Sequence, residues 1–195
     1  MVKRAHRFAL VLATSCVVLA GYAVAQSVTV ELSPEKSAVV FTLGASLHTV
    51  HGSFKLKSGV IHFNAATGEA SGMIVVDAAT GETGNDSRDK KMHKEVLESA
   101  KFPTFEFIPT RITGPVKEGS SQVEIEGTLR VHGQEHAIKL PATVDRNGEM
   151  LEASGKFEVP YVEWGMKNPR NVVLHVRDTV VVEVKGSGRI VPGKP

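Results

Sequence analysis

The stretch TGNDSRDKKMHKEVLESAKFPTFEF, residues Thr83–Phe107, predicts one helix in a chain that is otherwise patterned as strands. Asn85, Asp86 and Ser87 are candidate N-cap residues, because short polar side chains accept hydrogen bonds from unpaired backbone N–H groups. Pro103 cannot continue the helix, and a β-rich run follows it. The apolar stripe at helical spacing consists of Met92, Val96 and Leu97. A single amphipathic helix in such a chain is predicted to close or flank a β-barrel.

Alternating apolar and polar residues predict strands along most of the remaining chain. In residues 122–132 the apolar side chains fall on one face, with Gly127 in phase between them. Asn147-Gly148 predicts a hairpin turn, and Ser58-Gly59 predicts another. One apolar and one polar face on successive strands indicate an antiparallel sheet. The expected fold class is all-β with one or two short helices, and many strands in one domain favour a barrel or a sandwich.

The first 25 residues have the pattern of a secretory signal peptide. Basic residues precede an uncharged run over residues 8–24, and residues 23–25 form an A-x-A cleavage sequence. An uncleaved anchor is the rival interpretation, because the run is about as long as a short membrane span. A lipoprotein attached through Cys16 is a weaker alternative. We expect cleavage after Ala25, a periplasmic or secreted protein, and no stable membrane span after cleavage.

Removal of the signal peptide changes the net charge and the cysteine content of the chain. The full chain has 23 basic and 21 acidic residues; three of the basic residues lie in the signal peptide, so the mature formal charge is −1. The computed pI of 8.7 therefore does not indicate nucleic-acid binding. Cys16 is the only cysteine, which excludes disulfides, thiolate catalysis and cysteine metal sites from the mature chain. We expect one domain over residues 26–187 and a C-terminal tail over residues 188–195.

The inward-facing rows are mostly Val, Ile, Leu and Ala, and these smaller side chains leave room inside a barrel of about eight strands for a long apolar ligand. Trp164 and Tyr161 either cap the cavity or close an ordinary core; the sequence gives the two interpretations equal weight. The predicted lining is Phe41, Leu43, Val123, Ile125, Leu129, Val131, Ile138, Leu140, Phe157 and Val159, with Trp164 at one end.

Four polar residues are candidate contacts for a ligand headgroup: His48, His51, Arg88 and Tyr161. The spacing of His48 and His51 puts them on opposite faces of a strand, which argues against a metal site. Arg88 with Asp89 either binds a pyrophosphate or quinone head or, in the favoured interpretation, anchors the start of the helix to a neighbouring loop. We expect no catalytic residues and no metal, since no G-x-S-x-G turn or recognisable nucleophile is present.

Four motifs, in this order and spacing, carry a resemblance to a known family. They are Gly52-Ser53-Phe54; Thr83-Gly84-Asn85 with Arg88-Asp89 and Phe102-Pro103; Gly127-Thr128-Leu129-Arg130-Val131-His132-Gly133; and Trp164-Gly165-Met166. The chain resembles the YceI-like family of polyisoprenoid-binding proteins over about residues 28–184. The resemblance implies an extended lipocalin-like antiparallel barrel of about eight strands. It also implies an exported carrier or sequestering protein for an isoprenoid lipid, a quinone-like molecule or a similar amphiphile, with no cofactor and no conserved catalysis.

The sequence departs from this family at three places near the expected barrel openings. Lys36-Ser37 stands where the family has His-Ser, and Lys91 stands where a His follows Arg-Asp, with His93 shifted. Pro160-Tyr161 replaces Asn-Arg. These departures concern the identity of the headgroup rather than the fold.

Two other functions compete with a lipid carrier. A barrel with a filled core could bind another envelope protein through its outer face; the side chains that would plug it are Phe41, Phe54, Phe105, Phe107 and Phe157. A metal or haem-linked redox role through His48 and His51 is a distant third. The sequence leaves the oligomeric state open, a homodimer included.

Overall fold

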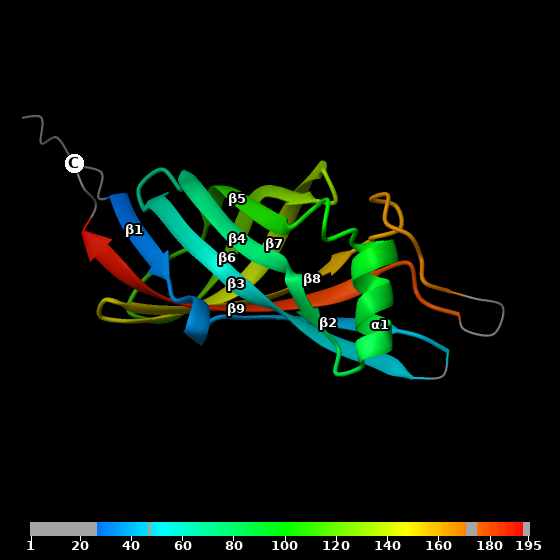
Figure 1. Ribbon diagram of the computed structural model, residues 1–195. Helices are drawn as coiled ribbons and strands as arrows, with labels where there is room; N and C mark the ends of the chain where they lie inside the picture. Colours follow the sequence, from blue (N-terminus) through cyan, green and yellow to red (C-terminus); the bar gives the residue numbers. More distant parts are fainter. Residues whose placement is uncertain (1–26, 47, 171–174, 193–195) are drawn as a thin grey trace, which may run out of the picture.

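The computed structural model describes residues 27–46, 48–170 and 175–192. In this part of the chain nine strands surround one interior, and a helical segment lies across one end (Figure 1). The strands are β1 (Ser27–Leu32), β2 (Ala38–Gly44), β3 (Thr49–Asn64), β4 (Ala70–Glu82), β5 (Thr104–Thr113), β6 (Gly119–Val131), β7 (Gln134–Asn147), β8 (Met150–Val159) and β9 (Val180–Pro192). The helical segments are the 3₁₀ turn η1 (Pro34–Lys36), the α-helix α1 (Asp86–Lys91) and the π-helical turn η2 (Met92–Val96).

The strands close into an antiparallel barrel. Each strand from β3 to β8 pairs with the next one in the sequence, and β1 and β2 fill the gap between β3 and β9. β2 pairs with β3 on one side and with β9 on the other; Val39, for example, lies opposite Phe54 of β3 and Val184 of β9. β1 pairs with other stretches of the same two neighbours. β1 and β2 therefore occupy the same place in the ring, one after the other along the barrel axis. Counted around the barrel, eight strands surround the interior in the described part of the chain. The predicted all-β, lipocalin-like barrel is confirmed.

Alternation along each strand decides which side chains face inward. Ile125 lies opposite Leu140 across β6 and β7, so these two apolar residues face the interior together. The intervening side chains face outward, where Lys139 lies 2.6 Å from Glu126 and 3.4 Å from Glu124. Hydrogen bonds to these carboxylates raise the pKa of Lys139, and the bond to Lys139 lowers the pKa of Glu126. Such exposed pairs contribute little to stability and keep the outer face polar.

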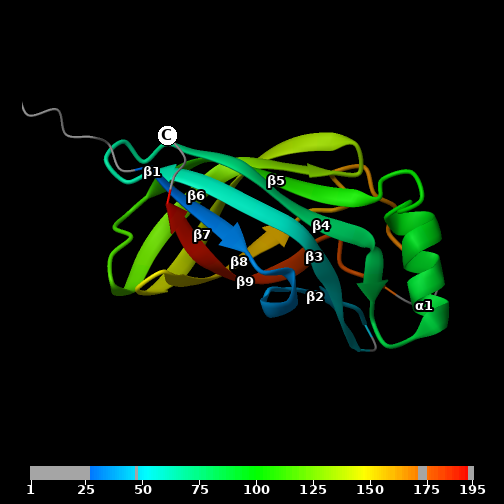
Figure 2. The same ribbon diagram turned by 60° about the vertical axis from the view of Figure 1, so that its left-hand side comes forward.

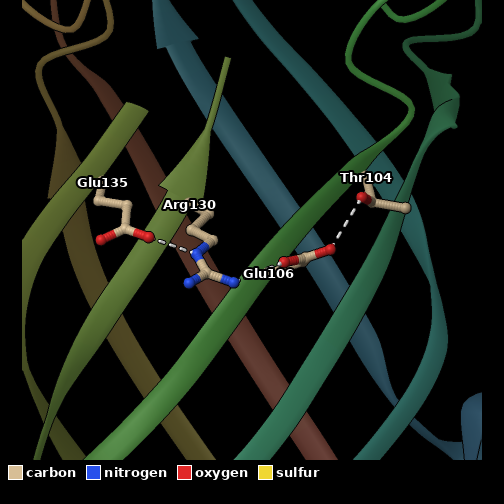
Figure 3. Close-up of polar contacts among 4 residues, drawn as sticks. All are labelled: Thr104, Glu106, Arg130 and Glu135. Atoms are coloured by element: carbon tan, nitrogen blue, oxygen red, sulfur yellow. Dashed lines mark hydrogen bonds and ion pairs between the residues drawn. The ribbon is translucent and has the colours of Figure 1, made fainter. Parts of the chain in front are cut away.

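A second outward cluster crosses β5, β6 and β7 (Figure 3). Arg130 Nε donates to Glu135 at 2.6 Å, and its Nη1 lies 3.4 Å from Glu106. The Thr104 hydroxyl donates to the other oxygen of Glu106 at 3.4 Å. The bond to Glu135 is the larger cause that raises the pKa of Arg130. These alternating acidic and basic side chains lie on the solvent-facing side of the barrel wall.

Two sequence-based boundaries are corrected. The turn predicted at Ser58-Gly59 is wrong, because β3 runs unbroken through it with only a register irregularity between Leu56 and Ser58. Gly59 is needed for packing: a Cβ there would lie 2.6 Å from Leu32 Cδ1. The tail predicted from residue 188 begins too early, since residues 188–192 complete β9 and pair with β1. The predicted signal peptide lies outside the described residues.

Buried apolar residues form two clusters, one at each end of the barrel. The helix-end cluster comprises Val96, Leu97, Val131, Val159, Tyr161 and Met166. The far-end cluster comprises Val30, Val123, Ala142, Val144 and Leu151. No helix in the described ranges is long and apolar enough to cross a membrane.

Candidate ligand-binding cavity

A cavity of about 860 Å³ lies inside the barrel. Residues of both the helix-end cluster and the far-end cluster contact it, so it extends from one cluster towards the other. Nearly all of its lining is aliphatic or aromatic. Cavities of this size and character hold small apolar ligands in other proteins. The architecture therefore leaves space where a solid core would otherwise lie.

Ten of the eleven side chains predicted to line the interior do line it; their contact with a ligand stays a prediction. They are Phe41, Leu43, Val123, Ile125, Leu129, Val131, Ile138, Leu140, Phe157 and Val159. Trp164 is the exception: it stacks on His136, with ring centroids 3.9 Å apart and planes inclined by 6°. Its indole packs against the helix-end cluster from outside the cavity lining. A turn residue has no strand periodicity to fix its direction, so sequence could not place it.

The phenylalanines that would plug the barrel in the filled-core alternative form part of its wall. Phe54 packs between Phe41 and Phe105, with ring centroids 5.3 Å and 5.2 Å away. All three rings, together with Phe107 and Phe157, line the cavity and leave its volume open. The filled-core alternative is therefore contradicted.

The helical segment closes one end of the barrel (Figures 1 and 2). Asn85 caps it, as predicted, by accepting a hydrogen bond from the Arg88 backbone N–H at 3.0 Å. Met92 lines the cavity, and Val96 and Leu97 are buried beneath it. The π-helical turn was not predicted: the Leu97 N–H bonds to the Met92 carbonyl at 2.9 Å, which keeps the apolar stripe facing the barrel.

Thr83 anchors the start of the helix to the end of β4. The Asp89 carboxylate accepts from the Thr83 backbone N–H at 3.0 Å and from its hydroxyl. Arg88 Nε donates to the Thr83 hydroxyl at 2.7 Å, and its Nη2 donates to the Thr83 carbonyl at 2.9 Å. Arg88 and Asp89 thus anchor the helix, which was the favoured interpretation, and Arg88 also lines the cavity.

Thr83→Val should loosen this anchor. The substitution keeps the side-chain shape but deprives Arg88 and Asp89 of the hydroxyl, at an expected loss of about 1–3 kcal/mol in the free energy of unfolding. Amide hydrogen exchange over residues 86–96 should accelerate. Thr110→Val is the matched control, since its exposed hydroxyl makes one bond, of 3.3 Å, to the Glu126 carbonyl. Equal exchange in the two variants would contradict the anchoring role.

His93 is a positioning residue that sequence reasoning missed. Its Nε2 lies 2.8 Å from the Gly81 carbonyl oxygen and its Nδ1 lies 3.0 Å from the Ser99 hydroxyl. Because a carbonyl only accepts, Nε2 carries the proton and Nδ1 accepts from Ser99. The ring ties η2 to β4 and to the loop that leads into β5.

Three of the four predicted headgroup residues line the cavity, and His51 does not. His48 and Arg88 line the cavity, whereas His51 lies on the outer face with its Nδ1 3.1 Å from the Thr42 hydroxyl. The metal or haem hypothesis, which needs both histidines, is therefore contradicted. Within the described residues no group of three or more His, Cys, Asp or Glu side chains could hold a metal ion.

Tyr161 lines the cavity, but its hydroxyl hydrogen is already engaged. The hydroxyl donates to the Arg177 carbonyl at 2.8 Å. Burial, followed by the nearby charge of Asp178, raises the pKa of Tyr161 to about 12. The side chain is therefore neutral at ordinary pH and offers a ligand its ring rather than a proton.

Lys91, which the sequence analysis named only as a departure from the family pattern, also lines the cavity. It lines the same end as Arg88, and its Nζ donates to the Pro169 carbonyl at 3.1 Å. The spacing from Arg88, three residues along a helix, is the signal that could have revealed it. Nearby, Lys167 pairs with Glu95 at 2.9 Å and lowers the pKa of that carboxyl. These contacts join the helical segment to residues 160–170 around one mouth of the cavity.

Comparisons with known proteins agree with this architecture. A sequence model of the YceI-like domain matches residues 30–187. A UPF0312 protein of Pseudomonas syringae pv. syringae is 32% identical over 114 residues. That match covers 57% of this chain and 57% of the relative, so the chain spans little more than half the length of the curated relatives it matches.

Several solved structures share the fold. A polyisoprenoid binding domain from Saccharophagus degradans superposes with a TM-score of 0.67 at 17% identity, covering 83% of this chain and 98% of that one. BcnA of Burkholderia cenocepacia gives 0.66 at 17% identity, covering 80% and 98%. A YceI protein of Campylobacter jejuni gives 0.60 at 19% identity, covering 77% and 88%. At these identities the similarity establishes the shared barrel.

Proposed function

Because this chain belongs to the YceI-like family, we propose that it is a binding protein that encloses a polyisoprenoid or a similar long apolar lipid in its barrel. The observation that carries this proposal is the apolar cavity of about 860 Å³ between the two end clusters. The polyisoprenoid binding domain of Saccharophagus degradans has the same fold, which supports the assignment of ligand class. The role is binding rather than catalysis.

The size of the cavity bounds the ligand. A cavity of this size has room for a tail of several isoprene units. Burial of each methylene contributes about 0.8 kcal/mol. Apolar contacts with an aliphatic lining have no required direction, so such a tail binds with few polar contacts. The proposed tail contacts are the ten predicted side chains that line the cavity.

The headgroup is proposed to lie at the mouth beside α1. Arg88 and His48 line the cavity there and supply polar groups to an otherwise apolar interior. Tyr161 contributes its ring at the same end. The tail then extends towards the far-end cluster, away from the helix.

Export is part of the proposal and rests on the signal-peptide pattern of residues 1–25. Cleavage after Ala25 would release the barrel into the periplasm or the medium, where it would transport, store or sequester its lipid. N-terminal sequencing of the secreted or periplasmic protein tests this directly. A chain that retains residues 8–24 in membrane fractions would contradict it.

Solvent extraction of the purified protein tests the binding function. We expect about one equivalent of a lipid whose tail has several isoprene units or a similar length of apolar chain, because the barrel holds one continuous apolar cavity. Mass analysis of the extract identifies it. A folded protein that releases no lipid and takes up no apolar fluorescent probe would contradict the proposal.

A further inference from the structure

Apart from Tyr161, the ionisable side chains that line the cavity are all basic. In the described part of the chain, neither Asp nor Glu contributes to the lining. The basic residues are His48, Arg88, Lys91, Arg146 and Lys185. The hydrogen-bond and ion-pair partners of each residue show where the protein itself balances this positive charge.

The two basic residues away from the helix have carboxylate partners. Arg146 Nε lies 3.8 Å from the Glu118 carboxylate and donates to the Gly148 carbonyl at 3.0 Å. Lys185 Nζ lies 3.2 Å from Glu152. The positive charge on this part of the wall is therefore balanced by the protein itself.

The helix mouth is different. Lys91 donates to a neutral carbonyl oxygen, that of Pro169, and Arg88 donates to the hydroxyl and carbonyl of Thr83. Among the described residues neither side chain forms an ion pair. Asp89 offsets part of the Arg88 charge through the shared Thr83 hydroxyl.

Glu95 is close enough for its charge to interact with that of Lys91, but its carboxylate is paired with Lys167 at 2.9 Å. Positive charge without a carboxylate partner of its own therefore gathers at the mouth beside α1.

We infer that the barrel selects amphiphiles with an anionic headgroup, a phosphate or a carboxylate, and holds that group between Arg88 and Lys91 with His48 beside them. Arg88 and Lys91 lie one turn apart on the same face of the helix. Both retain N–H donors beyond the bonds they make to the protein. An anion at this position gains charge-assisted hydrogen bonds next to a low-dielectric interior, where such bonds are strongest. This assignment rests on the proposed lipid-binding function and adds the charge of the ligand.

Tail-matched ligands test the inference. Geranylgeranyl phosphate and geranylgeraniol share one tail, which fits the cavity, and differ only in the charge of the head. Calorimetric titration of the mature protein should give an affinity for the phosphate about tenfold higher than for the alcohol. Lys91→Gln should remove most of that preference, because it should weaken binding of the phosphate far more than binding of the alcohol. Lys90→Gln is the matched control, since Lys90 is exposed on the same helix and does not line the cavity.

The possible outcomes distinguish a failure of the anionic-headgroup inference from a failure of the proposed lipid-binding function. If phosphate and alcohol bind equally, or if Lys90→Gln lowers the preference as much as Lys91→Gln, the anionic headgroup is refuted and the carrier function stands. If a folded protein binds neither ligand, the carrier function itself fails. Inorganic phosphate alone should bind far more weakly than geranylgeranyl phosphate. Equal, Lys91-dependent binding of inorganic phosphate would overturn the assignment to a lipid head.

Discussion

Leu129→Trp is expected to weaken binding of a long apolar ligand by roughly a hundredfold while the barrel stays folded. Leu129 faces the cavity from β6, and the larger indole would occupy space that the ligand tail needs. Displacing about four methylenes costs about 3 kcal/mol. Because open space rather than packed side chains lies in front of Leu129, the usual penalty for overpacking a core is avoided. Native mass spectrometry of both proteins, with a titration of the extracted lipid, measures the effect.

Val40→Trp is the control for the introduced ring. Val40 is on the outer face of β2 and is 40% exposed, so an indole there changes the surface and leaves the cavity intact. It should bind lipid as the unmodified protein does. Lipid retained by Leu129→Trp at the normal ratio would contradict the proposed pocket.

Gly127→Ala is expected to destabilise the protein by about 3 kcal/mol. Gly127 falls in the inward row of β6, and the ring of Phe107 covers it: a Cβ would lie 2.7 Å from that ring and 2.5 Å from the Ile108 carbonyl oxygen. A backbone oxygen in a paired strand cannot move aside without loss of its register. The shift should be measured as a lower urea midpoint with an unchanged slope.

Gly186→Ala provides the comparison on another strand. A Cβ at Gly186 would meet its nearest neighbour, Leu32 Cδ2, at 3.6 Å, which is ordinary contact. Its stability should change by less than about 1 kcal/mol. Equal losses at Gly127 and Gly186 would mean that a strand glycine matters for its backbone freedom rather than for the ring packed over it.

Period-two alternation explains why the wall of the barrel could be predicted from sequence. Once Val123 and Ile125 face inward, the register of neighbouring strands brings Leu140 to the same side. The cap at Asn85 was predictable for a similar reason, because it depends on local chemistry alone. Local patterns of this kind also identified the helix and ten of the lining side chains.

Features that depend on contacts between distant segments were not predictable. Gly59 looks like a turn residue in sequence, and only the packing of Leu32 against it explains the glycine. The sequence around Trp164 is equally consistent with a cavity cap and with core closure, and only its stack on His136 distinguishes the two. The sequence also does not show that Lys91 lacks an ion pair. That depends on its hydrogen bond to Pro169 and on the pairing of Glu95 with Lys167.

The position shared by β1 and β2 has a consequence for how the barrel opens. At the far end the gap between β3 and β9 is closed by β1 alone, a strand of six residues, while β2 closes the same gap near the helix. Local unfolding that separates β1 from its neighbours would open the far end while β2 still closes this gap near the helix. If the barrel binds a lipid as proposed, the tail would then have a second exit, on the side opposite the helix.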